Sequence, residues 1–335
     1  MRIAVVNDLS LAVEALKKVI LSNTEHELAW VAYDGIEAVK KNETDTPDLI
    51  LMDLIMPNMD GVEATKKIVE SKYCPILVVT ATVQGNSPKV FAALGNGALD
   101  AVKTPELTDT DSVNRILEKI ELLKPIIKNN IAKHKPKKEI KEKPGGVGSA
   151  NKILAICAST GGPHAIVKIL SKLPDNYNMP VVIVQHIDQS FVEGFADWLN
   201  RQTGLNVKIA EPGEEPKTGN VYVAGKNKHL IFDNYGKLNY TNEGVGAYYK
   251  PSIDIFFNSL CENSIDTLAV LLTGMGKDGA EGLKKLKEKG KFTIVQDENS
   301  SVVFGMPKAA IENDAACKIL PLEDIADEII KQNYE

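Results

Sequence analysis

Hydrophobic and polar positions alternate along the first part of the chain in two different patterns. Short continuous apolar runs are typical of buried strands, and apolar residues recurring every three or four positions are typical of amphipathic helices. The strand-like runs are Ile3–Val6, Leu28–Ala32, Leu49–Met52, Ile76–Val79 and Ala98–Val102. Helix-like stretches follow them at 11–21, 36–40, 62–70, 89–94 and 113–123. Because the two patterns alternate, residues 1–125 are predicted to form a doubly wound parallel sheet with helices on both faces.

The same alternation returns in residues 151–335. Strand-like runs occur at Ile153–Cys157, Val181–Gln185, Val207–Ala210, Leu268–Thr273 and Phe292–Val295. Helix-like stretches occur at 165–170, 191–200, 253–260, 282–289 and 307–311. Between Val221 and Tyr240, short runs separated by turn residues predict antiparallel hairpins. The α/β class is therefore predicted twice, the second time as a Rossmann-like doubly wound sheet with a β-hairpin excursion.

Residues 126–150 differ from both flanking regions. Lysines are frequent here, the run Pro144-Gly145-Gly146 follows, and the apolar periodicity stops after Ile131. Such a composition buries too little apolar surface to fold by itself and repels itself electrostatically. We predict a flexible linker at 126–150 between a domain at 1–125 and a domain at 151–335. A solvated hinge is favoured over a contact with an acidic partner.

Composition excludes several classes of protein. The chain has 335 residues, of which 44% are hydrophobic and 25% charged, and a net charge of −6. A negative net charge does not favour nucleic acid or a membrane surface as a partner. The four cysteines are widely spaced, which argues against a disulfide framework or a zinc site. No run approaches the length of a membrane span, and the first residues resemble a strand rather than a signal peptide. We expect a cytoplasmic protein with no direct membrane insertion.

The loop after the strand Ile153–Cys157 contains a candidate nucleophile. Ser159 stands before Gly161-Gly162-Pro163, and proline suits the first position of a helix. The unpaired N–H groups at a helix start can stabilise a developing oxyanion. Ser159 is therefore either a nucleophile or a small polar turn residue, and this stretch alone does not separate the two.

Two further residues follow strands of the same sheet. His186 ends the run Val181–Gln185, where it could accept a proton from a serine hydroxyl. Asp278 lies in the loop after Leu268–Thr273 and could orient that imidazole. His164 is a rival base, but a charged imidazolium is disfavoured at a helix start. We favour His186.

The loop that contains Asp278 also permits another interpretation. Gly274, Gly276 and Gly279 have the spacing of a dinucleotide-binding fingerprint, and Asp297 lies about 20 residues further on. This would indicate an NAD-dependent oxidoreductase, although Asp278 would then repel the pyrophosphate. A third possibility is a response regulator without catalytic activity.

Polar residues also follow strands of the first domain. Asp8 follows the first strand, Asp53 the third, and Thr80 the fourth. In a parallel sheet these positions meet in the crevice beyond the carboxyl ends of the strands. Paired carboxylates are ligands that Mg²⁺ prefers.

The first domain resembles a response-regulator receiver, which has a flavodoxin-like fold. The resemblance rests on Asn7-Asp8, on Asp53-Leu54-Ile55-Met56-Pro57-Asn58-Met59-Asp60-Gly61 and on Thr80. It implies that Asp53 accepts a phosphoryl group and that Thr80 contacts it. It also implies that Asp8, Asp53 and the carbonyl of Ile55 hold Mg²⁺. Receivers usually begin with two acids and have Lys directly before Pro, whereas this chain has Asn7 and the order Lys103-Thr104-Pro105. Lys103 therefore stands one position earlier than the lysine that pairs with the phosphoryl group in receivers.

Together the two domains resemble the chemotaxis protein-glutamate methylesterases of the CheB family. The strings are Ala158-Ser159-Thr160-Gly161-Gly162-Pro163, Gln185-His186, Tyr249-Lys250-Pro251-Ser252-Ile253-Asp254 and Leu272-Thr273-Gly274-Met275-Gly276-Lys277-Asp278-Gly279. The Asn7-Asp8 opening and the position of Lys103 are similar to the subgroup of alternative chemosensory pathways, to which Wsp-type enzymes belong.

This resemblance implies a mechanism. Ser159 attacks a glutamyl γ-methyl ester or a glutamine of a methyl-accepting chemoreceptor, His186 moves the proton and Asp278 orients His186. Thr160, Gly161, Gly162 and the backbone near Met275 would shape the oxyanion site, with no cofactor in this domain. A sensor histidine kinase of the CheA type would phosphorylate Asp53 and so uncover the catalytic crevice.

Overall fold

The computed structural model describes residues 1–81, 87–106, 109–130, 152–242 and 250–334. They form two compact units whose division falls between Pro136 and Lys137. That division lies inside the predicted linker at 126–150, of which residues 131–150 are outside the described ranges. Each unit is described separately below.

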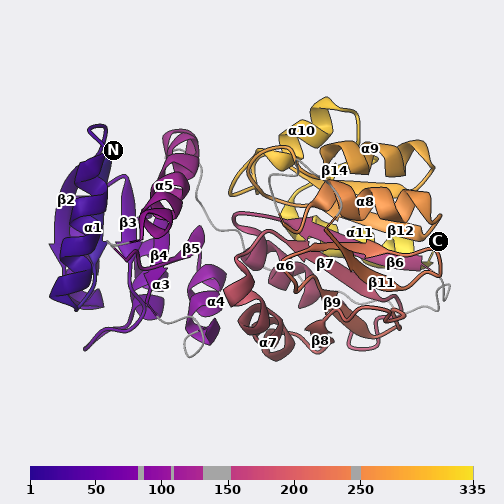
Figure 1. Cartoon of the computed structure of the whole chain (residues 1–335), viewed down its shortest axis with the longest axis horizontal. Helices are drawn as coiled ribbons and strands as arrows, with labels where there is room; N and C mark the ends of the chain where they lie inside the picture. Colours follow the sequence, from indigo (N-terminus) through magenta and orange to yellow (C-terminus); the bar gives the residue numbers. More distant parts are fainter. Residues whose placement is uncertain (82–86, 107–108, 131–151, 243–249, 335) are drawn as a thin grey trace. The chain divides into compact units, whose positions relative to one another are not determined.

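The first unit is a five-stranded parallel sheet in the order β2-β1-β3-β4-β5, with helices packed on both faces (Figure 1). Its strands are β1 (Arg2–Val6), β2 (Glu27–Ala32), β3 (Leu49–Met52), β4 (Ile76–Thr80) and β5 (Asp100–Lys103). Its helices are α1 (Ser10–Ser22), α2 (Gly35–Thr44), α3 (Gly61–Glu70), α4 (Ser87–Gly95) and α5 (Thr110–Asn130). Because the helices cover both faces, β3 and β4 are buried along their whole length.

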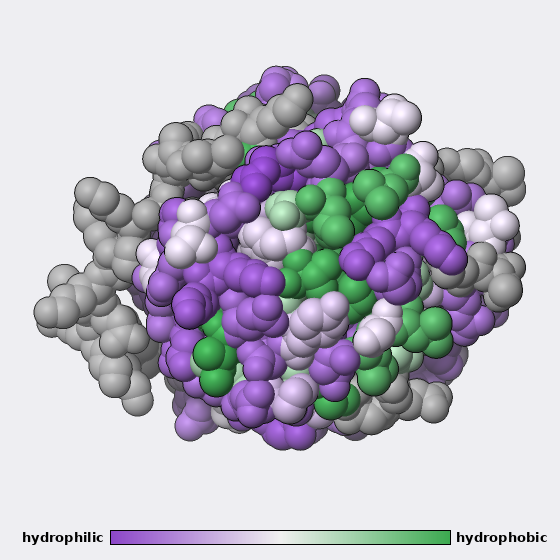
Figure 2. Space-filling model, turned by 90° about the vertical axis from the view of Figure 1, so that its left-hand side faces the viewer, coloured by the Kyte–Doolittle hydropathy of each residue, from purple (hydrophilic) through white to green (hydrophobic). Residues whose placement is uncertain are grey.

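One face of the molecule carries apolar residues gathered among polar ones (Figure 2). In the first unit, exposed apolar side chains include Leu11 and Leu21 of α1, which are 84% and 62% exposed. The buried residues of the same helix include Leu16 and Ile20. Helix α1 therefore presents apolar side chains to solvent as well as to the core.

The second unit is a seven-stranded parallel sheet in the order β14-β13-β12-β6-β7-β9-β8, with a separate hairpin of β10 and β11. Its strands are β6 (Lys152–Ala158), β7 (Val181–Gln185), β8 (Asn206–Ile209), β9 (Asn220–Val223), β10 (His229–Phe232), β11 (Leu238–Thr241), β12 (Asp266–Leu271), β13 (Phe292–Gln296) and β14 (Lys318–Leu320). Its helices are α6 (Gly162–Leu170), the short 3₁₀ helix η1 (Gln189–Phe191), α7 (Val192–Gln202), α8 (Ile253–Glu262), α9 (Ala280–Glu288), α10 (Met306–Glu312) and α11 (Leu322–Tyr334).

The predicted fold class is confirmed, with one correction and some additions. The pattern between Val221 and Tyr240 predicts antiparallel hairpins, but β9 is a parallel strand of the main sheet between β7 and β8. Within the described residues, the hairpin excursion consists of β10 and β11. The final strand β14 and helix α11 were not predicted, and α5 continues to Asn130.

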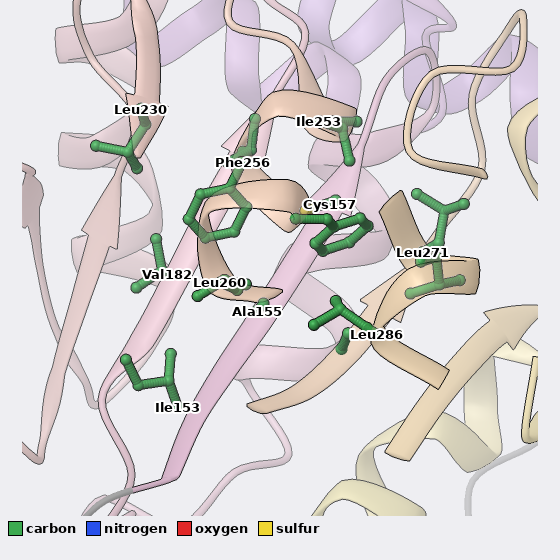
Figure 3. Close-up of a cluster of buried hydrophobic side chains, with 14 of the residues drawn as sticks. Ile153, Ala155, Cys157, Val182, Leu230, Ile253, Phe256, Leu260, Leu271 and Leu286 are labelled. Atoms are coloured by element: carbon green, nitrogen blue, oxygen red, sulfur yellow. The ribbon is translucent and has the colours of Figure 1, made fainter. Parts of the chain in front are cut away.

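One core of the second unit lies between the sheet and helices α8 and α9. Phe256 and Leu260 of α8 pack against Ala155 of β6 and Val182 of β7 (Figure 3). Each large apolar side chain buried in this way contributes about 1.5–3 kcal/mol. This packing holds the start of α8 beside the carboxyl ends of the strands, where the polar residues gather.

Among the described residues, no helix has the length and apolar character needed to cross a membrane.

Candidate active site

The sheet order of the second unit places Ser159 at a topological switch point. The chain proceeds from β6 to β7 on one side of the sheet and returns to β12 on the other side. In doubly wound sheets, ligands bind in the crevice at such a point, beyond the carboxyl ends of the strands. Ser159 directly follows β6 there, is 7% exposed, and donates its N–H to the carbonyl of Thr273 at 3.0 Å.

His186 occupies the equivalent position after the neighbouring strand. Ala158 of β6 pairs with Gln185 of β7, so Ser159 and His186 follow paired residues. The N–H of His186 donates to the carbonyl of Ala158 at 3.0 Å. The side-chain amide of Gln185 donates to the carbonyls of Ser159 (2.8 Å) and His186 (3.0 Å). A single buried amide therefore fixes the two backbones relative to each other.

Asp278 is the partner of the His186 imidazole. Nε2 of His186 lies 2.9 Å from Oδ2 of Asp278, and both side chains are nearly buried, at 7% and 11% exposed. The rival base His164 lies in the first turn of α6. The structure thus pairs Asp278 with the histidine that the sequence favoured.

The start of α8 holds the Asp278 carboxylate. Ser252, the N-cap of the helix, donates its hydroxyl to Oδ1 at 2.9 Å. The N–H groups of Ile253 and Asp254 donate to Oδ2 and Oδ1 at 2.8 and 3.0 Å. These are donors that a helix start leaves unpaired, and the positive end of the helix dipole favours an anion. Asp278 is therefore bound as a carboxylate at a helix N-terminus.

The environments of two neighbouring carboxyl groups move their pKa values in opposite directions. Burial alone would raise the pKa of Asp278, but the hydrogen bond and charge of His186 and the N–H groups of Asp254 and Ile253 lower it to about 2. Burial raises the pKa of Asp254, and the charge of Asp278 adds to the increase, against the hydrogen bond that Gly282 donates at 2.7 Å. Asp278 is thus the group that carries the negative charge next to His186.

The residues expected around the oxyanion lie beside Ser159. Gly161 has a φ of +79° and is the N-cap of α6, and Gly162 begins that helix. The carbonyl of Thr160 accepts the hydroxyl of Thr273 at 3.0 Å. Met275 follows Gly274, whose Cα lies so close to Ser159 that an added Cβ would stand 2.7 Å from the Cβ of Ser159. Thr160, Gly161 and Gly162 therefore follow Ser159 directly along the chain, and Met275 is adjacent to the glycine that packs against Ser159.

The glycines of the loop at 274–279 are explained by packing inside the protein. A Cβ on Gly274 would meet Sδ of Met306 at 2.3 Å, and one on Gly279 would meet Ile253 at 2.6 Å. Asp297, the expected ribose ligand of the NAD interpretation, instead accepts the N–H and hydroxyl of Ser300. These contacts favour the hydrolase interpretation over dinucleotide binding.

The first unit brings its acids together at its own switch point, between β1 and β3. Asp53 follows β3 and is 9% exposed, and its carboxylate accepts the N–H of Leu54 at 2.8 Å. Burial raises the pKa of Asp53 to about 6, and the charge of nearby Asp8 adds to the increase. Oxygen ligands with mutual repulsion of this kind fit a hard divalent cation. Asn7 binds the N–H of Leu9 at 2.9 Å through its side chain.

The other predicted receiver residues lie at the same edge of the sheet. Thr80 ends β4, is buried, and pairs with Lys103, which ends β5 with an exposed side chain. Ile55 follows Asp53 in the β3–α3 loop, with its side chain 49% exposed.

Sequence reasoning assigned no role to two residues of the site, Ser252 and His229. Ser252 had one available signal, a serine immediately before an apolar helical run. His229, whose Nδ1 accepts the N–H of Ser252 at 3.0 Å, had none, because the contact joins two segments 23 residues apart.

Comparisons with known proteins identify the family of each domain. Residues 154–329 match the CheB methylesterase family, and residues 3–113 match the response regulator receiver domain. A protein-glutamate methylesterase/protein-glutamine glutaminase of Cupriavidus pinatubonensis is 45% identical over 335 residues, covering 99% of this chain and 97% of that protein. A similarly named protein of Pseudomonas fluorescens is 45% identical and covers 99% of both chains.

A solved structure is similar to the second unit. The crystal structure of the Thermotoga maritima CheB methylesterase catalytic domain shares 38% identity with a TM-score of 0.52, over 55% of this chain and 100% of that one. The family predicted from the motifs is confirmed. The chain belongs to the CheB methylesterase family and carries a response regulator receiver domain ahead of the catalytic domain.

Proposed function

We propose that this protein hydrolyses glutamyl γ-methyl esters on chemoreceptors and that phosphorylation of its receiver controls the rate. The observation that carries the proposal is the His186–Asp278 pair, held on the start of α8 and adjoining Ser159. The names of relatives that match nearly the whole chain support the substrate.

In the proposed chemistry, Ser159, His186 and Asp278 have different roles. The hydroxyl of Ser159 attacks the ester carbonyl, and His186 takes its proton. Because Nε2 of His186 is directed at Asp278, Nδ1 is the nitrogen that accepts this proton. Asp278 stabilises the resulting imidazolium, which is the role of the third member of such a triad.

The intermediate then collapses in two stages. His186 returns its proton to the departing methoxide, methanol leaves, and the acyl group remains on Ser159. His186 then takes a proton from water, which attacks the acyl-enzyme; His186 passes that proton to the departing oxygen of Ser159, and the glutamyl product leaves as a carboxylic acid that ionises in water. The N–H groups around Thr160 and Met275, on a backbone shaped by Gly161 and Gly162, bind the negative oxygen in both stages. A single preorganised donor of this kind can contribute about 3–4 kcal/mol.

Deamidation of glutamine is a second activity of the same site. An amide follows the same acyl route, with ammonia as the leaving group instead of methanol. The relatives named protein-glutamine glutaminase support this activity.

The receiver supplies the control. We propose that Asp53 accepts a phosphoryl group from a CheA-type histidine kinase, with Thr80 and Lys103 contacting its oxygens. Asp8, Asp53 and the carbonyl of Ile55 would hold Mg²⁺, which neutralises the phosphoryl charge during transfer. The cytoplasm, where receptor and kinase would meet the enzyme, is the proposed location.

The decisive experiment measures methanol release from methylated receptor by the full chain. Ser159→Ala should abolish release, because it removes the hydroxyl that attacks the ester in the proposed mechanism. Ser171→Ala is the matched control, since Ser171 is an exposed residue at the far end of α6. Unchanged release by Ser159→Ala would exclude this serine as the nucleophile. An inactive wild-type protein would instead favour a non-catalytic regulator.

A further inference from the structure

His229 is a fully buried histidine that the proposed mechanism does not use. It begins β10, has 0% exposure, and accepts the N–H of Ser252 on Nδ1 at 3.0 Å. A ring nitrogen that accepts a hydrogen bond carries no proton, so the ring is neutral with its proton on Nε2. Burial lowers the pKa of His229 and the charge of Lys250 lowers it further, while Asp278 acts in the opposite direction.

The contact of His229 connects directly to the residues that hold Asp278. Ser252 donates its hydroxyl to Asp278 and accepts the N–H of Ile255 at 3.4 Å as the cap of α8. The next two N–H groups along the chain also bind Asp278. Any shift of Ser252 therefore moves three of the donors to that carboxylate.

The state of the second ring nitrogen, Nε2, indicates that His229 acts through its Nδ1 contact. Among the described residues, no acceptor reaches the buried Nε2 of His229. A buried donor left in this state costs about 1–3 kcal/mol. A smaller apolar residue would avoid that cost but would leave the N–H of Ser252 without its acceptor.

We propose that His229 is a positioning residue, which fixes Asp278 through Ser252 and thereby sets the orientation of the His186 imidazole. The inference rests on the proposed hydrolase function for its kinetic consequences. Its structural content, the geometry of the His186–Asp278 pair, can be measured independently of any substrate.

Two substitutions separate the role of Nδ1 from the role of ring volume. In His229→Asn, the amide oxygen can take the place of Nδ1 and accept the N–H of Ser252. In His229→Gln, the amide reaches the place of Nε2, and the Nδ1 acceptor is lost. Ser259→Ala is a matched control, because the hydroxyl of Ser259 accepts the N–H of Phe232 at 3.0 Å and so joins the same two elements, β10 and α8, away from Asp278.

The test compares these variants in the full chain by kinetics, thermal unfolding and proton NMR. We expect His229→Gln to lower kcat about 10- to 100-fold with little change in KM, as expected for a misplaced catalytic group. It should also weaken or shift the downfield resonance of the proton between His186 and Asp278. His229→Asn should keep that resonance and retain kcat within about threefold. Ser259→Ala should lower the unfolding temperature but leave the resonance and kcat unchanged.

Two outcomes would overturn the proposal. One is a His229→Gln variant that loses only stability, as the control does, with the resonance unchanged. The other is a His229→Asn variant whose loss of kcat and of the downfield resonance is as large as that of His229→Gln. If the wild-type chain releases no methanol, the hydrolase function fails, and the resonance in the variants still decides whether His229 positions Asp278.

Discussion

Glycine conformation and packing fix the immediate surroundings of Ser159. At Gly161 an added Cβ would stand 2.6 Å from the side chain of Val302, and the φ of +79° is one that other residues avoid. Gly213 has the same φ of +79°, but its Cβ position has nothing within 4 Å. The two glycines therefore differ in packing but not in backbone strain.

Replacing each glycine by alanine separates these two effects. Gly213→Ala should cost about 1–2 kcal/mol of stability from its left-handed backbone and leave kcat unchanged. Gly161→Ala should cost about 1–3 kcal/mol more, because the loop must move away from Val302. That movement displaces the oxyanion donors, so kcat should fall at least about tenfold. Methanol release measures kcat, and urea unfolding measures stability. Equal losses of kcat and stability in the two variants would contradict the packing argument.

The low pKa of Asp278 makes a prediction about pH. The pKa falls from an ordinary 3.8 to about 2 in the folded protein, so the unfolded chain binds more protons between these values. Stability from this group is therefore complete above about pH 4 and is lost as the pH falls towards 2. The shift corresponds to about 2 kcal/mol.

Urea unfolding of the second unit at pH 6 and pH 3 measures this contribution. In a Trp30→Phe background, Trp198 of α7 is the only tryptophan and reports on that unit. The difference in stability between this protein and its Asp278→Asn variant should shrink at pH 3. A difference that stays constant across this range would show that Asp278 is not an ionised group with a lowered pKa.

Residues that follow strands could be predicted from the sequence, and residues that join distant loops could not. Ser159, His186 and Asp278 each come after an apolar run, so the rule for parallel sheets places them at one edge. These residues are far apart in sequence, but the strands that precede them lie in one sheet, and the hydrophobic pattern predicts those strands. The contacts of Ser252 with Asp278 depend on how α8 packs on the sheet, which no local pattern encodes.

At the scale of elements, Thr273 joins three loops that meet beside Ser159, the proposed nucleophile. Its hydroxyl donates to the carbonyl of Thr160 and accepts the N–H of Val303 at 2.8 Å. Its own N–H donates to the side chain of Gln296 at 2.8 Å. One buried threonine thus connects the ends of β6, β12 and β13.

Thr273→Val should destabilise the protein and slow it. The lost hydroxyl leaves a buried N–H without its acceptor, at a cost of about 1–3 kcal/mol. Thr293→Val is the control, since Thr293 is equally buried, donates to Ala315 and accepts from Cys317, but joins β13 to β14. Both variants should lose similar stability in urea, and only Thr273→Val should lose kcat. A matching loss of kcat in Thr293→Val would assign the effect to general instability.

The direction of β9 shows the limit of reading elements from a local pattern. The run Val221–Val223 is short and bounded by polar and turn residues, as hairpin strands are. It became a parallel strand because its side chains are buried against β7 and β8. Similarly, β14 has only three residues, none fully buried, so its apolar signal is too weak to predict a strand.

At the scale of the whole molecule, each of the two parallel sheets has its candidate site at the point where the strand order reverses. The acids of the first unit lie between β1 and β3, and Ser159 lies between β6 and β12, each at a switch point of its own sheet. Strand order follows from the chain path, so both sites could be anticipated once the strands were recognised.

Phosphorylation of the receiver should change the rate of the hydrolase. With Mg²⁺ and a small-molecule phosphodonor, we expect methanol release by the wild-type chain to rise several-fold. Asp53→Asn should remove the response and keep the basal rate, since Asp53 belongs to the other unit. Labelled phosphoryl transfer measured in parallel tests the acceptor directly. Transfer to Asp53→Asn at the wild-type rate would contradict the assignment.

The binding of Asp278 at the start of α8 has a consequence for hydrogen exchange. Amides in the first turn of a helix have no intrahelical acceptor and normally exchange rapidly with solvent. Those of Ile253 and Asp254 donate instead to a nearly buried carboxylate. In heavy water they should exchange about as slowly as amides in the centre of β6. Asp278→Asn should shorten their lifetimes selectively, so that the two amides at the start of α8 report on the state of the Asp278 carboxylate.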